Sequence, residues 1–171
     1  MTTMNAKARV STPSDSEVEV TRDFKAPRTL VWQAHVDPNL MKRWLVGYPG
    51  WSMPVCDMDV RPGGRYRWRW RSDADGAEFG FVGEFKEVDE PALLSHYQYY
   101  DPGTFDSAMP LDNPCKIRNS FSEKDGITTL TARMDFGSKE ARDAAVSTGM
   151  TDGMETNYES LDRIFAELQG K

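Results

Sequence analysis

The chain has 171 residues, of which 39% are hydrophobic and 28% are charged. This length and this balance are typical of one globular domain with its own core, and they exclude a disordered chain. The formal net charge of −6 argues against a general nucleic-acid-binding protein, because the field of the whole chain repels phosphate groups.

Two cysteines, Cys56 and Cys115, lie far apart in the sequence. Their number excludes a disulfide scaffold, and their spacing matches no common zinc motif. The first residues lack the continuous apolar stretch of a signal peptide, and no apolar run approaches the roughly 20 residues that span a bilayer. We therefore expect a cytoplasmic protein with no membrane partner, no metal and no cofactor.

The start of the chain changes character at residue 17. Residues 1–16 are small and polar and predict a flexible tail, so that a single domain covers 17–171. Residues 17–27 alternate between apolar and polar side chains, which predicts a strand with one buried face. Two short helices are expected next, over 28–36 and 37–45, the second capped by Asp37.

Most of the remaining chain has the pattern of short strands separated by turns, after a Gly- and Pro-rich loop over residues 46–54. Strands are expected over residues 55–60, 65–72, 77–88, 92–101, 115–124 and 126–136. Residues 151–169 carry apolar side chains at helical spacing and predict a long helix with a broad apolar face. Short turns between strands indicate an antiparallel sheet, so we expect an α+β fold in which this helix packs on a sheet of about seven strands.

Residues 65–72, RYRWRWRS, interleave arginines with aromatic residues, a pattern that some nucleic-acid surfaces share. A hairpin with the next predicted strand places Trp68 opposite Phe81. The same register places Arg65 opposite Glu84, so carboxylates offset the arginines. That arrangement does not favour a nucleic-acid partner.

The two faces of this strand therefore have different expected environments. Burying its three rings is worth on the order of 10 kcal/mol as an upper bound, comparable to the whole stability of a domain. We expect these rings to be buried and the arginines to face solvent. The buried residues are Tyr66, Trp68 and Trp70, and the solvent-facing ones are Arg65, Arg67, Arg69 and Arg71.

The buried face of the sheet is expected to be unusually aromatic and to lie opposite methionines of the last helix. Rigid rings and flexible methionines are typical of apolar small-molecule cavities, although the same residues also fit a filled core. The candidate ligand-binding residues are Trp44, Trp51, Tyr66, Trp68, Trp70, Phe79, Phe81, Tyr97, Tyr99, Met150, Met154 and Tyr158.

A set of motifs occurs in a characteristic order along the chain. They are FKAPRTLVW (24–32), DPNLMKRW (37–44), VRPGGRY (60–66), GEFKEVDEPALL (83–94), and GMTDGME with LDRI (149–164). Together they resemble the activator of heat shock protein 90 ATPase homologue-like family, within the START-like (SRPBCC, polyketide-cyclase-like) superfamily. The resemblance implies a helix-grip fold, in which a curved antiparallel sheet wraps a long C-terminal helix and leaves a cavity between them.

The resemblance leaves three functions open. The first is binding of a small hydrophobic or aromatic molecule, and the second is cyclase- or hydratase-type chemistry in the same cavity. The third is a co-chaperone-like contact with a chaperone or a second copy of the chain.

No catalytic motif is present, and we assign no catalytic residue. His96, Glu87 and Asp152 are the candidates for acid–base chemistry. Residues 102–114 are expected to be either a lid over the cavity or a packed surface loop.

Overall fold

The structure is a computed structural model that describes residues 7–46, 49–101 and 113–170. Eight strands form one antiparallel sheet in the order β1-β2-β8-β7-β6-β5-β4-β3. Their bounds are Arg9–Ser11 (β1), Glu17–Phe24 (β2), Trp51–Met58 (β3), Arg65–Ser72 (β4), Glu78–Asp89 (β5), Leu93–Asp101 (β6), Cys115–Lys124 (β7) and Ile127–Asp135 (β8).

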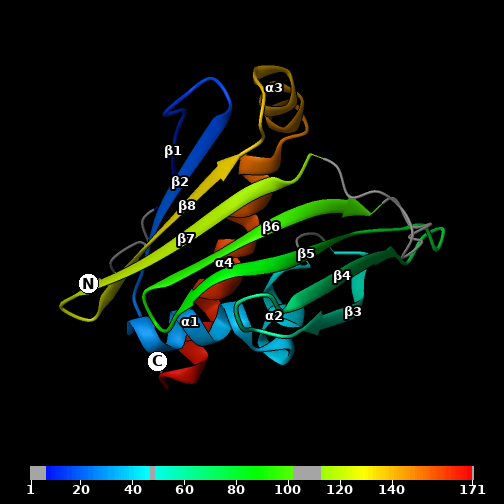
Figure 1. The fold of residues 1–171 in the computed structure, drawn as a ribbon. Helices are drawn as coiled ribbons and strands as arrows, with labels where there is room; N and C mark the ends of the chain where they lie inside the picture. Colours follow the sequence, from blue (N-terminus) through cyan, green and yellow to red (C-terminus); the bar gives the residue numbers. More distant parts are fainter. Residues whose placement is uncertain (1–6, 47–48, 102–112, 171) are drawn as a thin grey trace.

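Four helices accompany the sheet. They are Arg28–Val36 (α1), Pro38–Trp44 (α2), Lys139–Ser147 (α3) and Met150–Leu168 (α4). Figure 1 shows α4 lying along one face of the curved sheet, with α3 beside its start and α1 and α2 near its other end. We call the face toward α4 the inner face and the opposite one the outer face. The predicted helix-grip α+β architecture is confirmed, with eight strands instead of about seven.

The additional strand lies in the segment that the sequence predicts to be a tail. Residues 9–11 form β1 and pair with β2, where Val10 lies opposite Val20. The polar composition of this segment concealed the strand, because β1 is an edge strand with an exposed surface. A second difference is that β3 begins at Trp51, inside the predicted loop. Pro54 is tolerated there because β3 forms the other edge of the sheet.

The core forms where the inner face of β2 meets the C-terminal half of α4. Phe24 lies in β2, and its ring meets those of Tyr158 and Phe165 edge to face, with centroids 5.4 and 5.6 Å apart. Leu161 and Ile164 of α4 are also buried. The apolar stripe that predicts this helix is therefore the surface that packs on the sheet.

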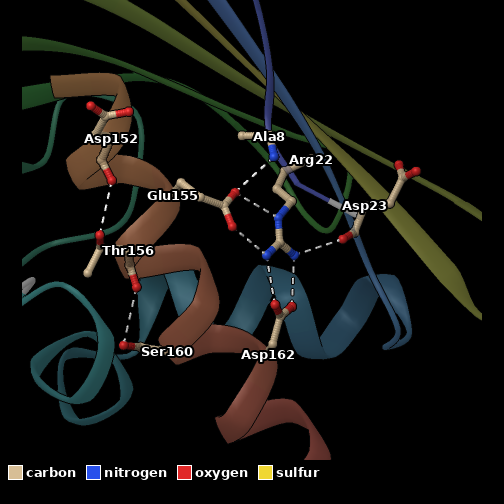
Figure 2. A network of polar contacts seen from close by, with 8 residues as sticks. All are labelled: Ala8, Arg22, Asp23, Asp152, Glu155, Thr156, Ser160 and Asp162. Carbon is tan, nitrogen blue, oxygen red and sulfur yellow. Dashed lines mark hydrogen bonds and ion pairs between the residues drawn. The ribbon is translucent and has the colours of Figure 1, made fainter. Parts of the chain in front are cut away.

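A buried cation joins the same two elements. Arg22 of β2 is 1% exposed, and its guanidinium lies between two carboxylates of α4, as Figure 2 shows. Asp162 accepts hydrogen bonds from both Nη atoms at 2.8 and 2.7 Å. Glu155 accepts from Nε and Nη2 at 3.2 and 3.1 Å, and the carbonyl of Asp23 accepts from Nη1 at 3.1 Å. All five N–H groups of the guanidinium are thereby used.

Glu155 has a further partner, since its Oε1 accepts a hydrogen bond from the backbone N–H of Ala8 at 2.8 Å. Burial alone would raise the pKa of the Glu155 carboxyl, but hydrogen bonds from Arg22 and Ala8 outweigh it and lower that pKa. The carboxylate therefore stays ionised. The network connects the residue before β1, strand β2 and helix α4.

The hairpin of β4 and β5 has the predicted register, but one prediction for its arginine face is wrong. Arg69 is buried, with 6% exposure. Its guanidinium crosses Gly80 of β5 and pairs with Asp101 of β6 at 2.7 Å and with Glu78 at 3.0 Å. Because Gly80 has no side chain, the guanidinium can reach the second strand over. The outer face is therefore not a continuous row of solvated arginines.

Replacing Arg22 with Met should lower the free energy of unfolding by about 3–5 kcal/mol, because it leaves the largely covered carboxylates of Glu155 and Asp162 without their cation. Arg133→Met is the matched control. Arg133 binds Glu17 at 2.6 Å but is 46% exposed, so its loss should cost less than about 1 kcal/mol. Urea denaturation of the two variants measures the difference. Equal losses would contradict a special role for the buried network.

Candidate ligand-binding site

A cavity of about 580 Å³ lies between the inner face of the sheet, α2 and the N-terminal half of α4. Aromatic side chains from β3, β4 and β5 form one part of its wall. Met150, Met154 and Tyr158 of α4 form part of the opposite side. The volume falls within the range of about 300–1,000 Å³ that drug-sized ligands occupy. The rings and methionines therefore line a pocket of the size that small molecules occupy.

The structure brings nine of the twelve candidate residues to the wall of this cavity. They are Trp44, Trp51, Trp68, Trp70, Phe79, Phe81, Met150, Met154 and Tyr158. Tyr66, Tyr97 and Tyr99 are not part of that wall. The face assignment made for β4 and β5 is therefore correct, and the one made for β6 is not.

Tyr97 and Tyr99 lie on the outer face, so the expectation that they face the helix is wrong. In the pairing of β5 with β6, Phe85 lies opposite His96, which turns the even-numbered residues of β6 inward. Tyr97 contacts the ammonium groups of Lys86 and Lys116, whose nitrogens lie 4.6 and 5.3 Å from the ring centroid. Tyrosines occur at both odd and even positions of β6. The sequence pattern alone therefore does not show which side of this strand faces the helix.

Tyr66 has a supporting position behind the wall. Its ring stacks on Trp68 with centroids 4.3 Å apart, and its hydroxyl lies 2.7 Å from Nδ1 of His96. The ring lies across Gly83 of β5, where an added Cβ would collide with it. The absence of a side chain at Gly83 therefore lets Tyr66 reach β6 and orient the His96 ring.

Five amide and imidazole side chains lie in the wall, and sequence reasoning names one of them, His96, as a candidate. The four that it misses are His35 of α1, Gln98 of β6, Asn119 of β7 and Asn157 of α4. The alternation of β7, with Ile117 and Phe121 on the same parity as Asn119, is the signal that could have found one of them. No Lys, Arg, Asp or Glu lies in the wall within the described part of the chain.

Both histidines of the wall are held neutral. Burial lowers the pKa of His35 to about 4, although its hydrogen bond with the carbonyl of Val31 partly opposes the shift. Burial, with a smaller effect from His35, lowers the pKa of His96 to about 3. Burial also raises the pKa of the Tyr66 hydroxyl. At neutral pH the wall therefore carries no formal charge from its described residues.

The indole N–H groups of the wall differ in their hydrogen bonds. Trp44 donates to the carbonyl of Ala34 and Trp70 to that of Leu45, both at 2.8 Å. Nε1 of Trp68 is buried and has no partner among the described residues. The ring of Trp68 is thus held by packing, whereas Trp44 and Trp70 are also held by a polar contact.

The other acid–base candidates lie away from the cavity. Glu87 binds Arg118 at 3.1 Å, and both side chains are more than half exposed. Asp152 is exposed in the first turn of α4.

Within the described residues, no group of three or more His, Cys, Asp or Glu side chains is placed to hold a metal ion. Cys56 and Cys115 are free thiols.

Two other expectations concern membranes and the loop at 102–114. None of the described helices is long and apolar enough to cross a membrane. Residues 102–112 lie outside the described residues, so the alternative between a lid and a packed loop stays a prediction.

The unequal hydrogen bonds of Trp68 and Trp70 give a testable difference in stability. Each Trp→Phe change removes an N–H group and a similar amount of ring surface. Trp70→Phe should cost about 1 kcal/mol more, because it also breaks a hydrogen bond and leaves the Leu45 carbonyl without its donor. Urea denaturation measures both losses. A larger loss for Trp68→Phe would contradict this assignment.

The buried neutral histidines should make the protein less stable in mild acid. The unfolded chain binds protons at His35 and His96 near pH 6.5, whereas the folded chain does not until about pH 4 and 3. The two histidines therefore leave the free energy of unfolding at its full value above pH 6.5. That free energy falls as the pH falls below 6.5, because protons bind the unfolded chain first. From pH 7.5 to 5 the loss should be roughly 2 kcal/mol per histidine. His96→Gln should remove about half of this dependence in urea denaturation, and an unchanged slope would contradict it.

The fold is similar to those of known proteins. The family described as Activator of Hsp90 ATPase homolog 1-like protein matches residues 25–166. A Rhodobacter sphaeroides crystal structure is 28% identical, with a TM-score of 0.83 over 95% of this chain and 99% of that one. A Mycobacterium smegmatis crystal structure is 26% identical, with a TM-score of 0.79 over 93% and 96%.

A more distant structure has the same fold. The solution structure of an AHSA1-like protein from Aeromonas hydrophila is 18% identical, with a TM-score of 0.64 over 89% of this chain and 94% of that one. No curated protein matches the chain. The family match covers most of the chain, including the strands and the helix that enclose the cavity. The chain therefore belongs to the Activator of Hsp90 ATPase homolog 1-like family.

Proposed function

We propose that this protein binds a small, mainly apolar molecule in the cavity between its sheet and α4. The observation that supports the proposal is the cavity of about 580 Å³, whose wall is formed mainly by aromatic and methionine side chains. Burying apolar ligand surface there is favourable by roughly 25 cal/mol per Å² before the costs of association. The flexible methionines of α4 adapt to ligands of different shape.

An enzymatic function in the same cavity is less well supported. His96 is the titratable group best placed for it, since it lies in the wall and is oriented by Tyr66. General acid–base catalysis is most efficient when the pKa of the catalytic group lies near the working pH. A pKa of about 3 makes His96 a weak base that is almost never protonated at neutral pH. Its properties favour a hydrogen-bonding role.

A protein-contact function is also less well supported. The name of the family suggests a chaperone partner, and a second copy of the chain is the other partner to consider. The row of arginines on the outer face of β4 is the surface that could make such a contact. Arg69 at the middle of that row is committed to Asp101 and Glu78 within the same chain. This internal pairing removes the central charge from the surface.

The binding proposal can be tested with N-phenyl-1-naphthylamine, a neutral dye that fluoresces in apolar surroundings. The wild-type protein should bind it saturably, with one dye per chain. Gly153→Phe should weaken binding by at least about tenfold, because Gly153 lies in the cavity wall and the new ring occupies the space. Replacing a helical glycine does not reduce helix propensity, so the fold should be retained.

Asp152→Phe is the matched control, since it adds the same ring to the same helical turn at an exposed position. It should leave the dissociation constant of the dye unchanged. Circular dichroism of each variant checks that the fold is retained. Absence of saturable binding by the wild type would contradict the proposal. Equal binding by Gly153→Phe and Asp152→Phe would place the dye outside the cavity and would also contradict it.

A further inference from the structure

The part of the cavity wall formed by β6 and β7, which we call the floor, contains a buried residue whose amide has no hydrogen bond to any described residue. Asn119 of β7 is 9% exposed and lies in the cavity wall. The side-chain oxygen and nitrogen of Asn119 keep some accessible surface. Because Asn119 lines the cavity, we infer that its amide group is open to the cavity. A ligand that displaces water from this amide without replacing its hydrogen bonds would lose about 1–3 kcal/mol. A ligand that carries a matching polar group avoids that loss.

His96 provides a second polar group beside this amide. The Tyr66 hydroxyl lies 2.7 Å from Nδ1, and its alternative acceptor, the carbonyl of Tyr97, is 3.5 Å away. If Nδ1 carried a proton and donated it to the hydroxyl, the hydroxyl would have to donate its own proton over the longer distance to Tyr97. We therefore assign the hydroxyl as the donor and Nδ1 as the acceptor. A neutral imidazole then carries its own proton on Nε2, which becomes a hydrogen-bond donor in the cavity wall.

The two groups are close on the inner face of the sheet. In the register of β6 and β7, His96 lies opposite Ile117 and Leu94 lies opposite Asn119. His96 and Asn119 are therefore diagonal neighbours, a separation that long side chains bridge. One small polar group on a ligand can contact both of them.

The wall is suited to neutral ligands. The described lining residues include no Lys or Arg, and neither histidine carries a charge at neutral pH. An anionic ligand would lose its hydration without gaining a cation, which is strongly unfavourable. The available polar groups are amides and neutral imidazoles, whose preferred partners are uncharged hydroxyl and carbonyl groups.

We propose that the cavity selects a neutral, ring-bearing molecule with a hydroxyl group, which accepts a hydrogen bond from Nε2–H of His96 and donates one to the amide oxygen of Asn119. This inference rests on the proposed ligand-binding function. It narrows the ligand class from apolar molecules in general to uncharged alcohols and phenols. Fatty acids and other carboxylates are excluded from that class.

The test compares three small probes as competitors of N-phenyl-1-naphthylamine at neutral pH. They are 2-naphthol, naphthalene and 2-naphthoate, which share a ring system and differ in the polar group. The wild type should bind 2-naphthol about tenfold more tightly than naphthalene, which corresponds to two modest hydrogen bonds. It should bind 2-naphthoate more weakly than naphthalene.

Asn119→Leu should abolish most of the preference for 2-naphthol while leaving the affinity for naphthalene unchanged or higher. Ile117→Leu is the matched control, since Ile117 lies in the same wall opposite His96 and offers no hydrogen bond. It should keep the tenfold preference. If Asn119→Leu does not fold, the ranking of the three probes by the wild type decides the question.

The outcomes separate this inference from the function on which it rests. Failure of the dye to bind the wild type contradicts the ligand-binding function itself. Binding of the dye with equal affinities for 2-naphthol and naphthalene overturns the hydroxyl inference alone. Tight binding of 2-naphthoate overturns the exclusion of anions. Retention of the preference by Asn119→Leu overturns the role given to that amide.

Discussion

The buried guanidinium of Arg22 decides where the last helix lies on the sheet. It binds two carboxylates that are seven residues apart on α4, so the helix is fixed in rotation as well as in position. Neither Glu155 nor Asp162 can move away without leaving a charge unpaired in the interior. In the C-terminal half of α4, Leu161 and Phe165 are buried in the core, whereas Met150 and Met154 of the N-terminal half line the cavity.

The chemistry of the cavity follows from this placement. Large rings from β3, β4 and β5 lie on one side of the cavity and methionines of α4 on the other. The floor is formed by β6 and β7, whose inward residues include His96, Gln98 and Asn119. Burial keeps the imidazole neutral, so the polar floor offers hydrogen bonds without charge. A wall of this kind favours uncharged molecules and gives a polar group on them a defined position.

Strand alternation and helical spacing predicted the layer order, the register of β4 with β5 and nine of the cavity residues. The same reasoning failed on β6, because its tyrosines occupy both parities and Tyr97 is held outside by two lysines. It also failed on Arg22, although the alternation of β2 places that residue on the buried face. A single charged side chain among apolar ones gives no indication of its partners. Glu155 and Asp162 lie more than 130 residues away, and only the fold brings them close.

Two glycines of β5 let side chains from β4 pass to β6. Arg69 lies opposite Gly80 on the outer face and reaches Asp101 on the strand beyond it. Tyr66 crosses Gly83 on the inner face to reach His96. A methyl group at residue 83 would therefore displace the Tyr66 ring and release the imidazole of His96 on the neighbouring strand. Relatives with a larger residue there must lack the tyrosine–histidine pair or rebuild it along another path. The identity of one small residue and the polarity of the cavity floor should consequently change together during evolution.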